Sequence, residues 1–176
     1  MKLRRIQITF MAVLFFSLTM FAQTNMKNYK AGHTFEVSIP DYMTKTTGLN
    51  DAATFQFRNS VKDIAGFIIF DTKADLELVE LKYTNAREFY DEFIKDFLAK
   101  QKNRNISEPK IQTVGDNNYV ECDASCYSKE SKTDIYYFVG VVETKNAFYK
   151  LLCFGGIDNK EKYKADFQKI LYSIKD

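Results

Sequence analysis

The chain of 176 residues is long enough for one domain with a sizeable core and too short for two comfortable ones. A hydrophobic content of 45%, with 16 Phe and 11 Tyr, excludes a disordered chain. The formal net charge is close to neutral at +2.

Residues 1–22 have the pattern of a signal peptide, with an apolar run from Ile6 to Phe21 and a cleavage region at Ala22 and Gln23. An uncleaved membrane anchor is the alternative, but the run is short for a membrane span and polar residues interrupt it. Cleavage removes three basic residues and no acidic one, so 22 basic residues face 23 acidic ones and the charge changes from +2 to −1. We therefore expect a periplasmic or secreted protein without nucleic acid as a partner and without stable membrane insertion.

The first half of the mature chain alternates between polar loops and short apolar strands. Residues 23–32 are polar and predict a flexible lead-in. Apolar alternation and β-branched residues predict three strands, at His33–Ile39, Ala53–Arg58 and Ile64–Phe70. Residues 41–52 read as a loop, and residues 71–83 fit a loop, a short strand or the start of a helix.

A helix is predicted from Ala86 to Lys100. Aromatic and aliphatic residues recur at helical spacing and form a wide apolar stripe, while the charged residues occupy the other side. Asn85 together with Glu88 can cap its first turn.

The last third of the chain predicts a meander followed by a helix. Residues 106–114 indicate a weak strand in which Pro109 favours an edge or a bulge, and residues 119–129 a long strand. The strand Ile135–Val142 is apolar on both faces, so we expect both faces to be covered. A tight turn at Lys145-Asn146 leads into the strand Ala147–Phe154. The closing helix is expected to begin with a capping box formed by Asp158 and Glu161 and to bury a stripe of five residues, Tyr163, Phe167, Ile170, Leu171 and Ile174.

These elements predict an α+β domain spanning residues 33–176. Short connections between the last strands imply an antiparallel meander, and its apolar faces require helices to cover them. The expected architecture is a central, mostly antiparallel sheet of about six to seven strands packed between helices.

The order of these elements resembles the PsbP/DcrB-like superfamily of small exported or lumenal proteins. Three stretches carry the resemblance: the opening strand Phe35–Pro40, the aromatic helix Phe89–Leu98, and the ending from Tyr149 to Ile174. The resemblance implies a PsbP-like fold and an accessory or binding role without enzymatic activity. These stretches hold core and capping positions, so the resemblance implies no catalytic residue.

Few residues are candidates for chemistry. Cys122, Cys126 and Cys153 lack the neighbouring ligands of a zinc site, and their expected strand positions keep them beyond disulfide reach, so three free thiols are predicted. His33 is the only histidine and is expected to face solvent at a strand end. No nucleophile elbow or phosphate-binding motif accompanies it. We therefore expect no cofactor, no metal and no catalytic residue.

One polar cluster is the candidate binding site. If Cys122, Val139 and Leu152 lie opposite one another on adjacent strands, then Glu121 and Asp123 share a sheet face with Tyr136 and Tyr149. Such a cluster could form a polar pocket that binds a partner or ligand. The alternative is an ordinary solvated sheet edge, and a slip of one residue would disperse the group.

The sequence favours an exported, non-catalytic accessory or binding protein of the bacterial cell envelope. It would act by contact with an envelope protein or a small ligand. The alternative is an envelope hydrolase, or another enzyme, with an unrecognised site.

Overall fold

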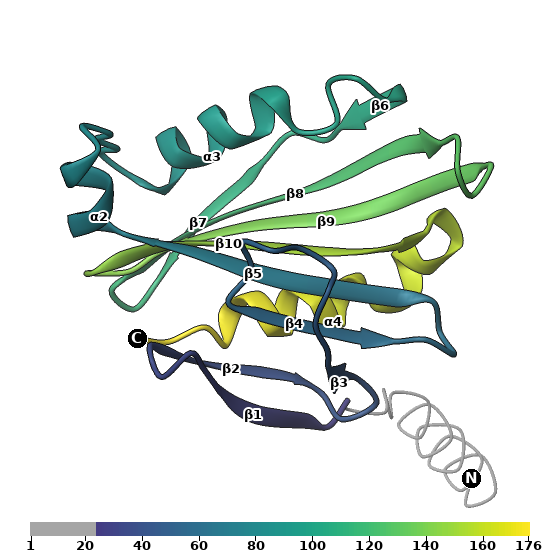
Figure 1. The fold of residues 1–176 in the computed structure, drawn as a ribbon, viewed down its shortest axis with the longest axis horizontal. Helices are drawn as coiled ribbons and strands as arrows, with labels where there is room; N and C mark the ends of the chain where they lie inside the picture. The colour runs from purple at the N-terminus through teal and green to yellow at the C-terminus, as the bar shows by residue number, and fades with distance from the viewer. Residues whose placement is uncertain (1–23) are drawn as a thin grey trace, which may run out of the picture.

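The structure, a computed structural model, describes residues 24–176 (Figure 1). The signal peptide predicted at residues 1–22 lies outside the described residues. Within the described part of the chain, none of the helices has the length and apolar character needed to span a membrane.

The described chain forms a large antiparallel sheet, a separate hairpin and three α-helices. The sheet has eight strands in the order β3-β4-β5-β10-β9-β8-β6, with β7 also paired to β8. It therefore has more strands than the six or seven expected. The elements are β1 Met26–Ala31, β2 Phe35–Pro40, β3 Thr44–Lys45, β4 Phe55–Asn59, β5 Ile64–Thr72, α2 Lys73–Leu78, α3 Ala86–Asp96, β6 Lys102–Ile106, β7 Lys110–Val114, β8 Asn117–Ser128, β9 Thr133–Glu143, β10 Ala147–Gly156, the 3-10 turn Ile157–Asn159 and α4 Lys160–Tyr172.

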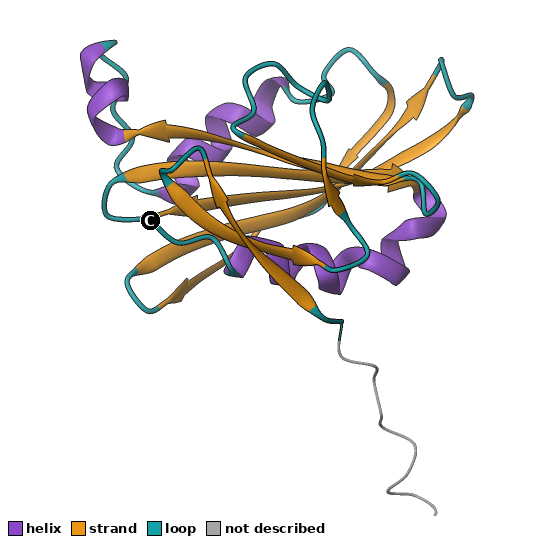
Figure 2. Cartoon of the chain, turned by 60° about the horizontal axis from the view of Figure 1, so that its bottom comes forward, coloured by secondary structure: helices purple, strands orange, loops and turns teal. Residues whose placement is uncertain are grey.

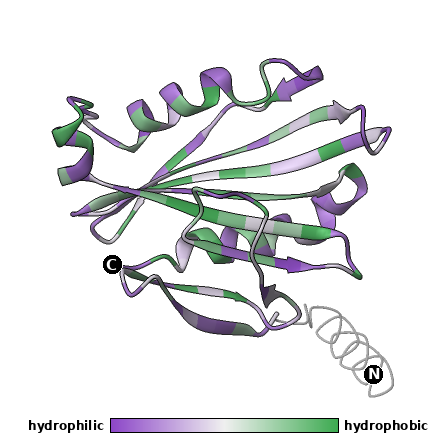
Figure 3. Cartoon of the chain, in the orientation of Figure 1, coloured by the Kyte–Doolittle hydropathy of each residue, from purple (hydrophilic) through white to green (hydrophobic). Residues whose placement is uncertain are grey.

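Each face of the sheet is covered by a different layer. Helix α3 lies on one face, which we call the α3 face, while α4 and the β1–β2 hairpin lie on the other, the α4 face (Figure 1). Figure 2 brings the hairpin forward and shows it crossing in front of the sheet beside α4. Hydrophobic residues are frequent in the inner strands of the sheet, whereas β1 is largely hydrophilic (Figure 3). The α+β architecture expected from the sequence, a mostly antiparallel sheet packed between helices, is confirmed.

The predicted register of the C-terminal meander is confirmed. Cys122 pairs with Val139, which in turn pairs with Leu152. The turn between β9 and β10 has Lys145 and Asn146 at its tip, and the Thr144 N–H donates to the Ala147 carbonyl at 2.9 Å. Alternation along three long strands and one tight turn was enough to specify which residues share a face.

The closing helix buries the stripe that its spacing predicts. Phe167, Ile170, Leu171 and Ile174 are fully buried, and Tyr163 is partly so. The predicted capping box is wrong, because a 3-10 turn follows Gly156 and moves the start of α4 to Lys160, where the N-cap residue makes no side-chain hydrogen bond. Gly140 lets α4 approach the sheet closely, since a Cβ atom there would lie 2.5 Å from a methyl carbon of Leu171.

The N-terminal region is more ordered than expected. Residues 26–31, within the predicted flexible lead-in, form β1 and pair along their whole length with β2. Within residues 24–176, strand β1 pairs with β2 alone, and most of its residues are polar. Its sequence therefore lacks the apolar alternation from which a strand can be predicted. His33 lies in the turn between them with a φ of 62°. The hairpin also reaches the end of the chain, because Glu36 pairs with Lys175 and the Ser38 N–H donates to the Ser173 hydroxyl at 2.9 Å.

In the middle of the chain, the structure decides one segment that was left open and differs from the prediction at two places. The undecided segment contains α2, which Thr72 caps by accepting a hydrogen bond from the Asp75 N–H. Helix α3 is capped by Asn85 as expected, but it ends at Asp96 instead of Lys100, because Phe97 is extended with a ψ of 121° and Leu98 follows with a left-handed φ of 59°. The polar residues that follow form β6, and Pro109 separates β6 from β7 along the same edge of β8.

Glu143 connects three elements at one end of the sheet. Its carboxylate accepts hydrogen bonds from Lys73 at 2.9 Å, from the Ala86 N–H at the start of α3 at 3.0 Å, and from Asn118 at 3.1 Å. Burial acts to raise the pKa of Glu143, but these bonds outweigh it and hold the pKa below its usual range. The position of α3 on the sheet therefore depends on a buried charge.

Candidate functional site

The structure brings three of the four predicted site residues together. Glu121 and Asp123 on β8 and Tyr136 on β9 lie on the α4 face, as the register predicted. Tyr149 shares that face but lies elsewhere, where its ring packs against Phe35 with centroids 5.0 Å apart and its hydroxyl donates to Asp176 at 3.3 Å.

Asp123 connects the sheet to helix α4. The buried hydroxyl of Tyr136 donates to one carboxylate oxygen at 2.8 Å, and the other oxygen pairs with Lys164 at 2.8 Å and Lys160 at 3.1 Å. Burial acts to raise the pKa of Asp123, but the three hydrogen bonds outweigh it and lower the pKa. For Tyr136, burial and then the bond to the carboxylate raise the pKa of the phenol.

Glu121 makes a similar connection one turn further along α4. Gln168 donates to one of its oxygens at 2.7 Å and Tyr172 to the other at 3.0 Å, while Lys110 of β7 lies 3.5 Å away. The side chain is 5% exposed. Both carboxylates thus accept hydrogen bonds from other residues of the chain. This geometry is explained by a structural role, in which the cluster holds α4 against the sheet. Binding of a partner at these residues stays a prediction.

A more open site lies on the opposite face of the sheet. A pocket of about 720 Å³ is bounded by the β4–β5 turn, the β8–β9 turn and the end of β10. We call it the sheet-end pocket. Its apolar lining includes Ile135, Tyr137 and Phe154, and its rim carries Arg58, Ser60, Ser128 and Glu130. A volume of this size is within the range of small-molecule sites, roughly 300–1,000 Å³.

The pocket exists because α3 is too short to cover its face of the sheet. Eleven helical residues extend about 16 Å, whereas the eleven residues of β9 extend about 36 Å. Val139 and Val141 lie beneath α3 and are fully buried, but Ile135 and Tyr137 on the same face are only partly buried. The expectation that this strand is covered on both faces is therefore wrong at its first residues.

Half-buried aromatic rings continue from α3 into the pocket. Phe97 contacts Tyr137 with centroids 5.4 Å apart, and Tyr137 contacts Phe154 at 5.9 Å. Phe67 follows on β5, 6.3 Å from Phe154. Rings in such a row leave edges and faces available to an apolar ligand. Sequence reasoning missed this group. One signal could have identified these rings: the strands of the C-terminal meander are predicted to be longer than the helix that covers the same face of the sheet.

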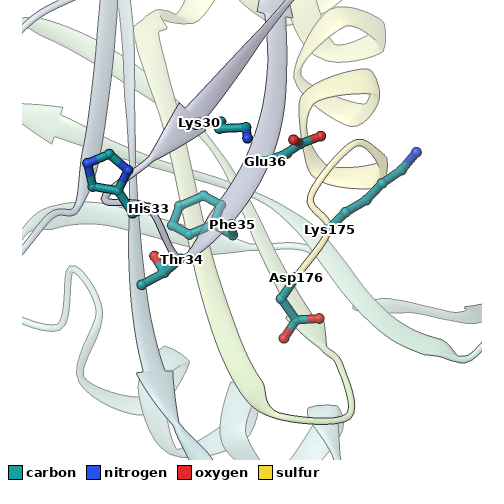
Figure 4. A pocket seen from close by; sticks show the side chains of 7 residues that line it. All are labelled: Lys30, His33, Thr34, Phe35, Glu36, Lys175 and Asp176. Atoms are coloured by element: carbon teal, nitrogen blue, oxygen red, sulfur yellow. The ribbon is translucent and has the colours of Figure 1, made fainter.

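His33 lies apart from the residues that line the sheet-end pocket. It is exposed and lines a separate hollow of about 340 Å³ with Lys30, Glu36, Lys175 and Asp176. Figure 4 shows its ring on the opposite side of this hollow from Lys175. No hydrogen bond links the imidazole to any residue from 24 to 176 that could orient it as a base.

The cysteines are separate and buried. Cys122 and Cys126 lie on the α3 face, Cys153 lies on the α4 face, and none forms a disulfide in residues 24–176. Burial raises the pKa of each thiol. Within that range there is also no group of three or more His, Cys, Asp or Glu residues placed to hold a metal ion.

No protein-family model matches the chain, and no curated protein matches its sequence. Similar solved structures exist at low identity. The solution structure of the cyanobacterial PsbP protein CyanoP from Synechocystis sp. PCC 6803 is 12% identical with a TM-score of 0.61, over 90% of this chain and 96% of that one. LpqN of Mycobacterium tuberculosis, involved in cell envelope biogenesis, is 10% identical with a TM-score of 0.54, over 86% and 90%. A Bacteroides thetaiotaomicron protein is 11% identical with a TM-score of 0.55, over 85% of this chain and 47% of that one.

Proposed function

We propose, from its PsbP-like fold, that the chain is a non-catalytic binding protein of the bacterial cell envelope that holds a small ligand in the sheet-end pocket. The observation that carries the proposal is the row of half-buried rings that continues past the end of α3 into an open pocket with a polar rim. An apolar lining with a few polar groups at its edge is the usual composition of a ligand site.

The comparison with LpqN supports the envelope as the place of action, because that protein is involved in cell envelope biogenesis. The fold itself fixes no ligand. Export, with cleavage near Gln23, is part of the same proposal, since an envelope protein must leave the cytoplasm.

A variant that fills the pocket tests the proposal. Ala65 forms part of the pocket floor, so Ala65→Phe should occupy the space of a ligand. Ala165→Phe makes the same change on the exposed surface of α4 and is the matched control. The proteins are recovered from the envelope fraction of the producing cell and weighed by native mass spectrometry, with thermal unfolding as a check on folding.

We expect a bound mass in the wild type and in Ala165→Phe that is absent from Ala65→Phe. If Ala65→Phe fails to fold, Phe154→Ala, which removes one wall of the pocket, replaces it. A bound mass of equal occupancy in every variant would show that the pocket is not the binding site. Turnover of an envelope substrate that is lost on replacing His33 would instead favour the hydrolase alternative.

A further inference from the structure

The register of four strands places a charged and an apolar group at a defined separation in the sheet-end pocket. Arg58 pairs with Ala65, Ala65 with Phe154, and Phe154 with Tyr137, so the four residues form one row across the sheet. At about 4.8 Å per strand, Arg58 is roughly 10 Å from Phe154 and about 14 Å from Tyr137 along this row. Ala65, the small residue between them, lines the pocket.

The positive charge of Arg58 has no ion-pair partner among residues 24–176. Its Nε and Nη2 atoms lie 2.9 and 2.6 Å from the hydroxyl oxygen of Ser60, a neutral acceptor. A guanidinium has five N–H donors, so several remain for a ligand. A planar guanidinium fits a carboxylate through two parallel hydrogen bonds.

Three charged side chains line the pocket, and they are Arg58, Asp63 and Glu130. Glu130 lines the pocket from the β8–β9 turn, at the side away from Arg58. Asp63, in the β4–β5 turn, also lines the pocket but lies beyond ion-pair distance of Arg58. Arg58 is the one cationic side chain among the described residues that line the pocket, so a negative group is attracted at its β4 side.

We infer that the ligand is an organic anion with a flat apolar body, whose carboxylate pairs with Arg58 while its body lies over Ala65 against Phe154 and Tyr137. This inference rests on the proposed function, because it assigns a chemical class to the ligand of the same pocket. The row spans about 14 Å of backbone from Arg58 to Tyr137, and a molecule with two fused rings is chosen to probe it.

The test compares two probes of similar shape, the anion 2-naphthoate and its neutral amide 2-naphthamide. Affinities are measured by titration calorimetry for the wild type, Arg58→Gln and Phe154→Ala. Arg87→Gln is the matched control, because it removes the same charge from an exposed position on α3, where the one ion pair of Arg87 within residues 24–176 is a surface contact with Asp91.

We expect the wild type to bind naphthoate about tenfold more tightly than naphthamide, as a charge-assisted hydrogen-bonded pair at an exposed rim allows. Arg58→Gln should remove this difference, Arg87→Gln should keep it, and Phe154→Ala should weaken both probes. Equal affinities in the wild type, or an unchanged ratio in Arg58→Gln, would overturn the anionic class. If neither probe binds although the native bound mass disappears in Ala65→Phe, the ligand class is wrong and the pocket still functions. Failure of both measurements would refute the proposed function itself.

Discussion

Replacing Asp123 by alanine distinguishes a structural from a binding role for the polar cluster on the α4 face. Its carboxylate accepts from the hydroxyl of Tyr136, which is 1% exposed as a residue, and pairs with two lysines of α4. Alanine would leave a buried hydroxyl without an acceptor and would detach one edge of α4. We therefore expect Asp123→Ala to lower the free energy of unfolding.

The magnitude follows from the exposure of each partner. A buried hydrogen bond to a charged group contributes about 1.5–3 kcal/mol. Lys160 and Lys164 are each 37% exposed, so solvent screens their ion pairs, and together they add about 1 kcal/mol. The expected loss is about 3 kcal/mol, which lowers the melting temperature by roughly 6–12 °C in a domain of this size.

A double-mutant cycle with Tyr136→Phe measures the buried bond alone. Urea unfolding of the wild type, both single variants and the double variant should give a coupling energy of about 1.5–2 kcal/mol. Asp123→Asn, which keeps an acceptor oxygen, should lose less stability than Asp123→Ala. A loss below about 0.5 kcal/mol for Asp123→Ala, together with lost capture of an envelope partner, would refute the structural account and support binding at this cluster.

Four further predictions concern the rest of the chain. Folding lowers the pKa values of Asp123 and Glu143, so the stability that these carboxylates contribute is fully present above their unfolded pKa values, near pH 4, and is lost as the pH falls through their folded pKa values. Urea unfolding should therefore show a free energy of unfolding that declines below about pH 4, and the decline should be less steep in Glu143→Gln. Gly140→Ala should cost about 1–3 kcal/mol because its Cβ would meet Leu171, and Leu171→Ala should show non-additive recovery in the double variant. Thiol labelling should find three reactive cysteines in denaturant and almost none in the native protein, whereas a single reactive thiol would mean a disulfide. Intact mass should place the mature N-terminus within a few residues of Gln23, and a full-length mass in the membrane pellet would show an uncleaved anchor.

The C-terminal half of the fold could be predicted because its signals are local. Alternation in β8, β9 and β10 and the turn at Lys145-Asn146 specify the register, and helical spacing specifies the buried stripe of α4. Strand β1 could not be predicted, because its polar sequence has no apolar alternation. Its residues form a strand because they pair with β2. Strand β6, which is also polar, was missed for the same reason.

The candidate site was predicted only in part. The register brought Glu121 and Asp123 to the face of Tyr136, but no sequence pattern shows that α4 supplies partners to both carboxylates. The sheet-end pocket depends on where α3 ends. Phe97 and Leu98 fit the helical period, yet Leu98 is left-handed, and Arg104 donates to the carbonyls of Ile94 and Phe97 at the end of the helix. The end of α3 is therefore set by tertiary contacts, which the hydrophobic period of the sequence does not reveal.

The contact between the β1–β2 hairpin and the last residues has a consequence for the order of folding. The hydrogen bond from Ser38 to Ser173 joins positions 135 residues apart, and closing so long a loop costs entropy before any contact forms. The meander of β8, β9 and β10 has contacts close in sequence and can form earlier. A chain still lacking α4 would expose the apolar α4 face, including Phe138 and Leu151, to water. The packing of α4 against the sheet therefore decides when this domain ceases to be prone to aggregation.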